Sequence, residues 1–207
     1  MMTTPQPSPA TVFVVDDDEA VRDSLALLLR SVELAVATFS NAHEFLDSYD
    51  PAAPGCLILD VRLPGMSGLE LQQRLADDGA DLPIVFITGH GDVPMAVRAM
   101  RRGAVDFLQK PFSDQELLDR AQQALAEQSQ RRQQSESKAE IAQRIRSLTP
   151  REHEVMELIV EGLANKVIAN RLGTSQRTVE VHRASVMRKM QADSVARLVH
   201  LVFAADT

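Results

Sequence analysis

Over the first 120 residues, short apolar runs alternate with stretches whose apolar residues recur at helical spacing. The apolar runs predict strands at residues 11–15, 36–39, 56–60, 83–88 and 105–108. The stretches between them predict helices at 19–31, 42–49, 67–76, 93–102 and from 113 onward. Five strands alternating with five helices predict an α/β fold, in which a parallel sheet is covered by helices on both faces.

The composition changes near residue 122, where glycine and proline disappear and Gln, Ala, Arg and Glu dominate. These are mostly good helix formers and few of them are large and apolar, so residues 123–146 are predicted as a solvated helical linker. Leu118, Leu125 and Ala139 have the spacing of a coiled-coil seam, which Arg132 interrupts. A coiled-coil contact and a single exposed helix both remain open.

The remaining residues, 147–207, carry only helical patterns and predict an all-α domain of four helices. Thr149-Pro-Arg-Glu152 has the spacing of a capping box at a helix start. Helices are expected at 152–161, 165–172, 176–190 and from 194 to about 204. Two short helices separated by a turn at Gly173, the second of them rich in arginine, form a helix-turn-helix pattern.

Charge is distributed unevenly over the 207 residues, whose net charge is −7. Residues 1–122 contain 9 Lys and Arg against 19 Asp and Glu, whereas residues 163–190 contain 6 against 1. An acidic first part and a local basic patch indicate two domains with different partners.

The composition argues against several classes of protein. No apolar run approaches the roughly 20 residues that cross a bilayer, so no membrane partner is expected. Residues 1–10 are polar and proline-rich, and predict a short disordered lead rather than a signal peptide. Cys56 is the single cysteine, which precludes an intramolecular disulfide and suits a core position in a reducing cytoplasm.

Polar side chains follow the predicted strands at the points where they end. Asp16, Asp17 and Asp18 follow the first strand, Asp60 ends the third, Thr88 ends the fourth, and Lys110 follows the fifth. Because the carboxyl ends of parallel strands share one edge, these groups are expected to converge. The carboxylates suit Mg²⁺, which would offset their mutual repulsion. A remaining carboxylate would then be a nucleophile toward a phosphoryl group, with Lys110 neutralising charge and Thr88 donating a hydrogen bond.

Each of these residues also has a structural interpretation. Asp18 is placed to cap the helix that begins at Glu19, and Asp17 taken alone could equally be a cap. Lys110 taken alone is typical of a solvated surface lysine. A calcium loop at 16–27 is excluded, because the glycine at its sixth position and the glutamate at its twelfth are missing.

Three stretches carry a resemblance to a known family: VVDDDEAVRDSL, LILDVRLPGMSGLEL and IVFITGHGDVPMAVRAMRRGAVDFLQKPF. Residues 11–122 resemble the receiver domain of two-component response regulators of the FixJ type. The resemblance implies a flavodoxin-like five-stranded fold in which Asp60 accepts the phosphoryl group from a sensor histidine kinase. It implies that Mg²⁺ is bound by Asp17, Asp60 and the backbone carbonyl of Arg62, and by Asp16 through a water. It further implies phosphoryl contacts from Thr88 and Lys110, a cis Lys110–Pro111 bond, and a switching aromatic at Phe107.

The stretch LTPREHEVMELIVEGLANKVIANRLGTSQRTVEVHRASVMRKM resembles the LuxR/FixJ-type helix-turn-helix. The resemblance implies that 165–172 is the scaffold helix and 176–190 the recognition helix on double-stranded promoter DNA. Val179, Val186 and Met190 share one helical face and are expected to pack inward. The DNA-binding candidates are Lys166, Thr174, Arg177, Thr178, Glu180, Val181, Arg183, Ala184, Arg188 and Lys189.

Some of these candidates have alternatives. Arg188 and Lys189 lie near a helix C-terminus, where they would equally well interact with the helix dipole. Glu180 cannot bind phosphate. It would accept a hydrogen bond from a cytosine amino group, or else pair with Arg177 or Arg183. Ala184 would touch a thymine methyl group.

Together these features predict a DNA-binding response regulator rather than an enzyme. Phosphorylation of Asp60 would draw in Thr88 and then Phe107, and so change the face formed by 93–102 and 105–108. A homodimer would follow through pairing across a two-fold axis of Asp106 with Arg98, Arg101 or Arg102.

Two rival functions fit less well. An aspartate-dependent phosphohydrolase would carry a second Asp two residues after the nucleophile, where this chain has Arg62, and a cap domain. An RNA-binding antiterminator is disfavoured because the basic region is a helix-turn-helix and the chain has one Tyr and no Trp for base stacking.

Overall fold

The computed structural model describes residues 10–89 and 93–206. The predicted disordered lead, apart from Ala10, and His90 to Asp92 of the loop after Thr88 lie outside these residues. The chain divides into two compact units, Met1–Arg131 and Arg132–Thr207. No helix in the described part of the chain combines the length and apolar character that crossing a membrane requires.

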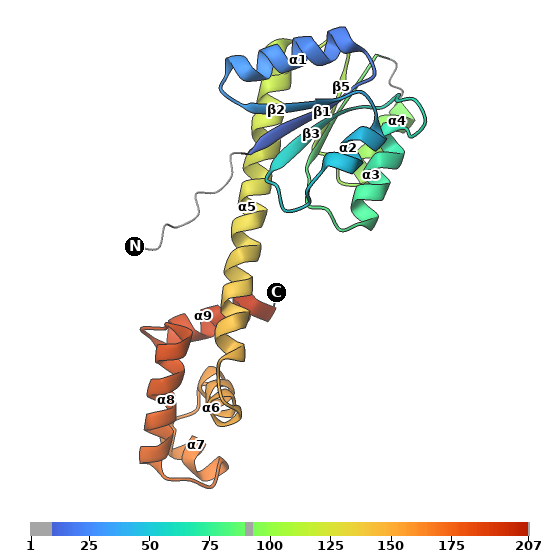
Figure 1. The fold of residues 1–207 in the computed structure, drawn as a ribbon. Helices are drawn as coiled ribbons and strands as arrows, with labels where there is room; N and C mark the ends of the chain where they lie inside the picture. The colour runs from blue at the N-terminus through green and yellow to red at the C-terminus, as the bar shows by residue number, and fades with distance from the viewer. Residues whose placement is uncertain (1–9, 90–92, 207) are drawn as a thin grey trace. The chain divides into compact units, whose positions relative to one another are not determined.

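The first unit is built on a sheet of five parallel strands in the order β2-β1-β3-β4-β5 (Figure 1). The strands are β1 (Thr11–Val15), β2 (Ala35–Phe39), β3 (Gly55–Asp60), β4 (Ile84–Thr88) and β5 (Asp106–Gln109). Each predicted strand is confirmed, with ends that move by at most one residue. This order places β1, β3 and β4 side by side, so that Asp16, Asp60 and Thr88 fall at one edge.

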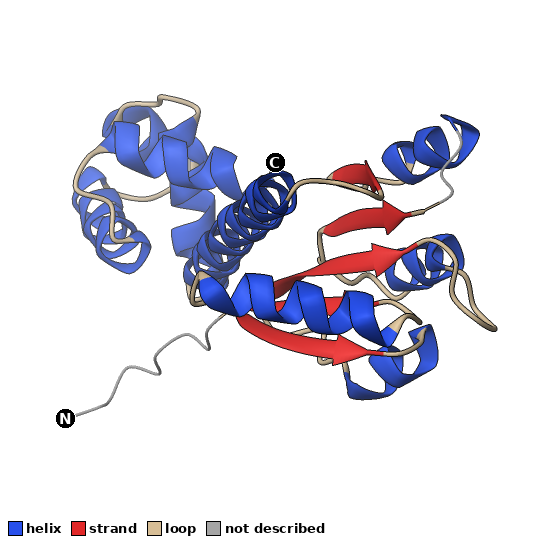
Figure 2. Ribbon diagram, turned by 90° about the horizontal axis from the view of Figure 1, so that it is seen from above, coloured by secondary structure: helices blue, strands red, loops and turns tan. Residues whose placement is uncertain are grey.

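Helices cover both faces of the sheet (Figure 2). The first four are α1 (Glu19–Ser31), α2 (Ala42–Ser48), α3 (Gly68–Asp77) and α4 (Val93–Arg101). Leu25 and Leu29 of α1 share one apolar core with the strands and the start of the last helix of the unit. Phe45 of α2 and Leu71 of α3 belong to the core on the opposite face. Alternate strand residues supply the two cores, which explains why β1, β3 and β4 are apolar on both faces except at their ends, where Thr11, Asp60 and Thr88 lie.

Local hydrogen bonds start the helices where the sequence predicts. Asp18 caps α1 by accepting hydrogen bonds from Ala20 N at 2.9 Å and Val21 N at 3.4 Å. Ser67 and Glu70 form a reciprocal capping box at the start of α3. These contacts satisfy N–H groups that have no partner inside the helix, and the capping role expected of Asp18 is confirmed.

Helix α5 runs without a break from Asp114 to Arg146, which confirms the long helical linker. Its first half is not solvated, because Leu117, Ala121 and Ala124 are buried against the sheet. Leu118 and Leu125 pack against the same core, so the coiled-coil alternative loses two of the apolar residues on which it rested.

Side chains of α5 contact the first unit as far as residue 131. Gly55 N donates to Gln128 Oε1 at 2.9 Å, and Arg131 Nη1 lies 3.1 Å from Asp81 Oδ1. Residues 129–140 are exposed. Only this shorter stretch has the solvated character predicted for the whole of 123–146.

The second unit contains the end of α5 and four further helices: α6 (Pro150–Val160), α7 (Asn165–Arg171), α8 (Gln176–Met190) and α9 (Val195–Asp206). The predicted capping box of Thr149 and Glu152 starts α6, with Pro150 in its first turn. Val179, Val186 and Met190 are fully buried, which confirms the inward face of α8. Cys56, in the first unit, is also buried, and its burial raises the pKa of its thiol to about 12.

Candidate functional site

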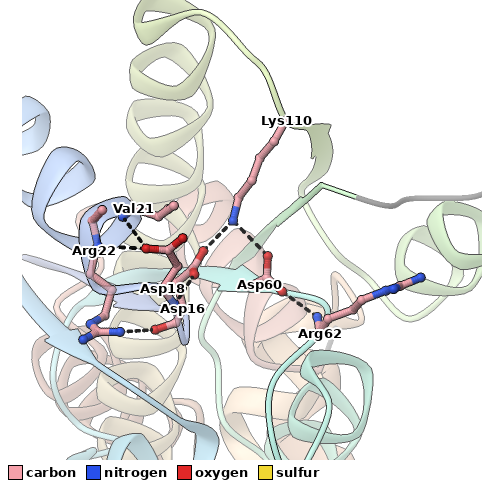
Figure 3. Close-up of polar contacts among 8 residues, drawn as sticks. Asp16, Asp18, Val21, Arg22, Asp60, Arg62 and Lys110 are labelled. Carbon is pink, nitrogen blue, oxygen red and sulfur yellow. Dashed lines mark hydrogen bonds and ion pairs between the residues drawn. The ribbon is translucent and has the colours of Figure 1, made fainter.

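Two carboxylates and one ammonium group meet at the carboxyl edge of the sheet (Figure 3). Lys110 Nζ lies 2.6 Å from Asp16 Oδ2 and 3.0 Å from Asp60 Oδ1. Both carboxylates are buried, at 1% and 5% exposure for Asp16 and Asp60. The structure therefore brings together three residues from separate elements that the strand-end pattern had placed at one edge.

The other carboxylate oxygens are held by backbone N–H groups. Asp18 N donates to Asp16 Oδ1 at 3.0 Å, and Arg62 N donates to Asp60 Oδ2 at 2.6 Å. Arg22 Nη1 donates to the carbonyl of Asp16 at 2.8 Å, a contact that no sequence pattern had indicated. These partners offset the cost of removing two ionised groups from water.

Lys110 is held in place by its own backbone. Its N–H donates to the carbonyl of Thr88 at 2.8 Å, and the Lys110–Pro111 peptide bond is cis, as the resemblance implied. The side chain is 24% exposed, so Lys110 is not the solvated surface lysine of the alternative interpretation.

Burial and charge act in opposite directions at this site. Burial raises the pKa of Asp60 above its ordinary value, although hydrogen bonding to Lys110 and the charge of Lys110 partly counteract it. Burial would lower the pKa of Lys110, but the hydrogen bonds and charges of Asp16 and Asp60 outweigh burial and raise that pKa. The ammonium group therefore stays charged at neutral pH and stabilises the ionised carboxylates.

Thr88 and Phe107 lie on neighbouring strands beside this cluster. Thr88 is buried at the end of β4. Phe107 on β5 is partly buried, and its ring centroid lies 6.2 Å from that of Phe86. The strand order explains why Thr88 lies beside the cluster of carboxylates. The switching roles of Thr88 and Phe107 remain predictions.

The third carboxylate of the opening pattern, Asp17, is exposed. Within residues 10–89 and 93–206, no three acidic, His or Cys side chains gather closely enough to hold a metal ion. The donor set nevertheless fits Mg²⁺ chemically, because Asp16, Asp17, Asp60 and the carbonyl of Arg62 offer only oxygen atoms. The buried Asp16 and Asp60 already share one cation, Lys110, which shows that this site favours positive charge.

The predicted dimer face contains contacts within one chain. Asp106 Oδ2 on β5 lies 2.5 Å from Arg120 Nε of α5. The two side chains form an ion pair, but the Nε atom of Arg120 makes no hydrogen bond. Arg102 Nη1 donates to the carbonyl of Leu69 at 3.3 Å. Arg98 and Arg101 are exposed on α4. No sequence pattern indicates this pairing of Asp106 with Arg120, because the two residues lie on a strand and a helix that meet only in the folded unit.

Most of the DNA-binding candidates form one exposed surface in the second unit. The exposed candidates on α8 are Arg177, Thr178, Glu180, Val181, Ala184 and Arg188. Among them, Arg177, Val181, Ala184 and Arg188 follow one another at steps of three or four residues, which places them on one face of the helix. Lys166 on α7 is also exposed, and Thr174 is half-buried.

Two basic candidates on α8 have partners inside the unit. Arg183 Nη1 donates to Asn165 Oδ1 at 3.2 Å. Lys189 Nζ lies 2.7 Å from Glu152 Oε2. Among the described residues, no ion pair joins Glu180 to Arg177 or Arg183, so the pairing considered for Glu180 is not observed.

Comparison with known proteins agrees with both units. Residues 12–122 match the response regulator receiver domain, and residues 146–202 match the luxR family of bacterial regulatory proteins. The chain is 48% identical to the transcriptional regulatory protein FixJ of Azorhizobium caulinodans, over 96% of this chain and 94% of that protein. It is 50% identical to nodulation protein W of Bradyrhizobium diazoefficiens, over 93% of this chain and 85% of that protein.

A solved structure of the response regulator StyR is also similar. It is 50% identical, with a TM-score of 0.89, over 95% of this chain and 99% of that one. The strand-end carboxylates, the exposed face of α8 and these matches together show that the chain belongs to the DNA-binding response regulators, with a receiver domain followed by a DNA-binding domain of the bacterial luxR family.

Proposed function

We propose that Asp60 is the phosphorylation switch of this regulator and that a sensor histidine kinase is the donor. Membership of the family implies a kinase partner for the receiver domain and DNA for the luxR-family domain. The observation that carries the proposal is the contact of Lys110 Nζ with a buried Asp60 carboxylate at the end of the central strand β3. An aspartate that served only packing would not require a cation drawn from another strand end.

In the proposed step, a carboxylate oxygen of Asp60 attacks the phosphorus of the kinase phosphohistidine. The new O–P bond forms as the N–P bond breaks, and the imidazole keeps the electron pair of that bond. Lys110 balances the charge that accumulates on the acyl phosphate, and Thr88 donates a hydrogen bond to a phosphoryl oxygen.

Receiver domains of this family generally use Mg²⁺. In this chain Asp17, Asp60 and the backbone carbonyl of Arg62 would hold the ion, with Asp16 acting through a water. The ion supplies positive charge that neutralises the phosphoryl oxygens. Asp17, which is exposed, would complete the set of oxygen donors.

The output of the switch would be a homodimer formed through α4 and β5. Movement of Thr88 toward the phosphoryl group would let Phe107, whose ring already lies beside that of Phe86, turn further inward. The changed face would then allow Asp106 to pair with Arg98, Arg101 or Arg102 of a second copy. Two DNA-binding domains brought together bind two half-sites, which is how phosphorylation would promote promoter binding.

The proposed division of labour follows the family matches. Residues 11–122 would form the receiver domain, 123–146 the helical linker, whose part up to residue 131 packs on the receiver, and 147–207 the DNA-binding domain, in which α7 supports α8 as the recognition helix. The exposed face of α8 and Lys166 would contact DNA. Since the DNA partner is chromosomal, the protein would act in the cytoplasm.

The test is the molar mass of the full chain by light scattering, in Mg²⁺, with and without beryllofluoride as a phosphoryl mimic. We expect the mimic to shift wild type from monomer to dimer and to leave Asp60→Asn unchanged. Arg74→Gln, which alters an exposed ion pair on α3, is the matched control and should respond like wild type. A mimic-dependent dimer in Asp60→Asn, or no change in wild type, would remove Asp60 as the switch.

A further inference from the structure

A buried glutamate joins the recognition helix to the first helix of the DNA-binding domain. Glu152, in the first turn of α6, is 6% exposed. Its Oε2 accepts from Thr149 N at 2.8 Å and from Lys189 Nζ at 2.7 Å, and its Oε1 accepts from Ser185 Oγ at 2.5 Å. Ser185 and Lys189 lie one turn apart on α8, so a single carboxylate links the start of α6 to the second half of α8.

Lys189 is engaged on the inner side of this link. Besides Glu152, its Nζ donates to the carbonyl of Ser147 at 3.0 Å, and the side chain is 29% exposed. If Lys189 left to contact a DNA phosphate, the buried carboxylate of Glu152 would lose its charged partner. Its neighbour Arg188 is exposed. Two adjacent basic residues therefore have different environments, although they look alike in the sequence.

Directional contacts are needed because the apolar packing of α8 is not directional. Val179, Val186 and Met190 bury one face, but such contacts tolerate small rotations and shifts along the helix axis. Hydrogen bonds weaken steeply when their geometry changes. The contacts of Glu152 with Ser185 and Lys189 therefore select the rotation of α8 at which its opposite face is exposed.

We propose that Glu152 and Lys189 are a positioning pair that sets the recognition helix for DNA, and that Lys189 makes no phosphate contact. Glu152 remains ionised at physiological pH, because hydrogen bonds from Lys189, Ser185 and Thr149 lower the pKa of its carboxyl group to about 2. The proposal concerns binding by the luxR-family domain itself and does not depend on phosphorylation of Asp60.

The salt dependence of DNA binding distinguishes a positioning lysine from a phosphate ligand. Each lost phosphate contact reduces the slope of log K against log salt by about 0.9. The probe is a fluorescein-labelled duplex of mixed sequence, titrated with the full chain between about 50 and 200 mM NaCl. The variants are Lys189→Gln and Arg188→Gln, which remove the same charge from adjacent positions. Circular dichroism and hydrogen exchange of residues 176–190 confirm that each variant is folded.

We expect Lys189→Gln to weaken DNA binding by about two- to thirty-fold, which is the range found when a residue acts on a site indirectly. The slope of log K against log salt should stay that of wild type. Lys189→Arg, which retains a cation for Glu152, should restore most of the affinity. Arg188→Gln should reduce the slope instead. A slope reduced by about 0.9 in Lys189→Gln would make Lys189 a phosphate ligand and overturn the proposal. Unchanged affinity in folded Lys189→Gln would overturn it as well.

Glu152→Gln provides a second test if Lys189→Gln does not fold. The single amide oxygen can still accept from Ser185 Oγ or from Thr149 N, which bond different oxygens of Glu152, while one negative charge is lost from a DNA-binding surface. Charge alone predicts tighter binding in this variant, whereas loss of positioning predicts weaker binding at an unchanged slope. Tighter binding by Glu152→Gln would contradict the proposal.

Discussion

Asp106 on β5 faces Arg120 on α5 of the same chain, with Oδ2 and Nε 2.5 Å apart. The carboxylate through which a second copy was expected to bind therefore already has a basic partner. Both side chains are partly exposed, at 29% for Asp106 and 41% for Arg120, so the ion pair is screened and exchangeable. Formation of the proposed dimer would replace one ion pair by another, so Arg120 would compete for Asp106 with Arg98, Arg101 or Arg102 of the second copy.

Arg120→Gln should therefore favour the dimer. The in-chain ion pair is a partly exposed one, so its removal is expected to strengthen dimerisation in beryllofluoride by about two- to five-fold. Sedimentation velocity over a concentration series measures this dissociation constant. Asp106→Asn should weaken the dimer instead, and a weaker dimer in Arg120→Gln would show that Arg120 supports the interface rather than competing with it.

The buried Asp60 carboxylate should lower stability at neutral pH. Its pKa is raised in the folded state, so the folded protein binds the proton more tightly than the unfolded chain does. Stability from this group is therefore greatest at low pH and is lost as pH rises through the raised pKa. We expect Asp60→Asn to melt at a higher temperature than wild type at pH 7. This difference in melting temperature should become smaller as the pH falls toward 3.8, the ordinary pKa of an aspartate. Calorimetry at several pH values tests this, and a lower melting temperature for Asp60→Asn at pH 7 would contradict it.

Chelation of Mg²⁺ should abolish the response to beryllofluoride. The carboxylates of the site suit a hard cation, and the phosphoryl mimic adds further negative charge beside them. Asp17→Asn should raise the Mg²⁺ concentration required for dimerisation and leave the fold intact, because Asp17 is exposed. Light scattering during a Mg²⁺ titration gives the midpoint. A response that persists in EDTA would exclude a metal role in the switch.

Gln128 should stabilise the junction between α5 and the sheet. Gln128→Ala would leave Gly55 N and the carbonyl of Asp81 without this partner, which is expected to cost about 1–3 kcal/mol of unfolding free energy. Urea unfolding measures the loss, and hydrogen exchange should increase in residues 123–131. Gln130→Ala, at an exposed position of the same helix, is the control. Equal effects of the two substitutions would assign the loss to helix propensity.

Glu152 should make the DNA-binding domain sensitive to acid. Its pKa is about 2 in the folded state against an ordinary 4.5, so its stabilising contribution is complete above pH 4.5 and is lost as pH falls toward 2. Acid unfolding of the full chain, followed by hydrogen exchange of residues 150–190, should show this loss in wild type. Glu152→Gln should be less stable at neutral pH and should depend less on pH between these values. An identical pH dependence would show that Glu152 does not carry the acid sensitivity.

The amino-acid sequence by itself determined where the helices and strands lie and where the helices begin. Strand periodicity, helical spacing and the capping residues Asp18 and Thr149 act over a few neighbouring positions, so each is visible in a short window of sequence. It also predicted one long-range cluster, that of Lys110 with Asp16 and Asp60, although these pairs are 94 and 50 residues apart. That prediction succeeded because parallel strands must end at the same edge, a rule that needs no knowledge of side-chain packing.

The tertiary structure alone decided the partners of residues that lie on helix surfaces. Gln128 meets Gly55 across 73 residues and Lys189 meets Glu152 across 37, and no periodicity marks either pair. A helix offers several polar residues around its circumference, and the one that is buried depends on how the helix rotates against its neighbour. For this reason Lys189 and Arg188 were interchangeable in the sequence, whereas in the folded domain Lys189 holds a buried carboxylate and Arg188 is exposed.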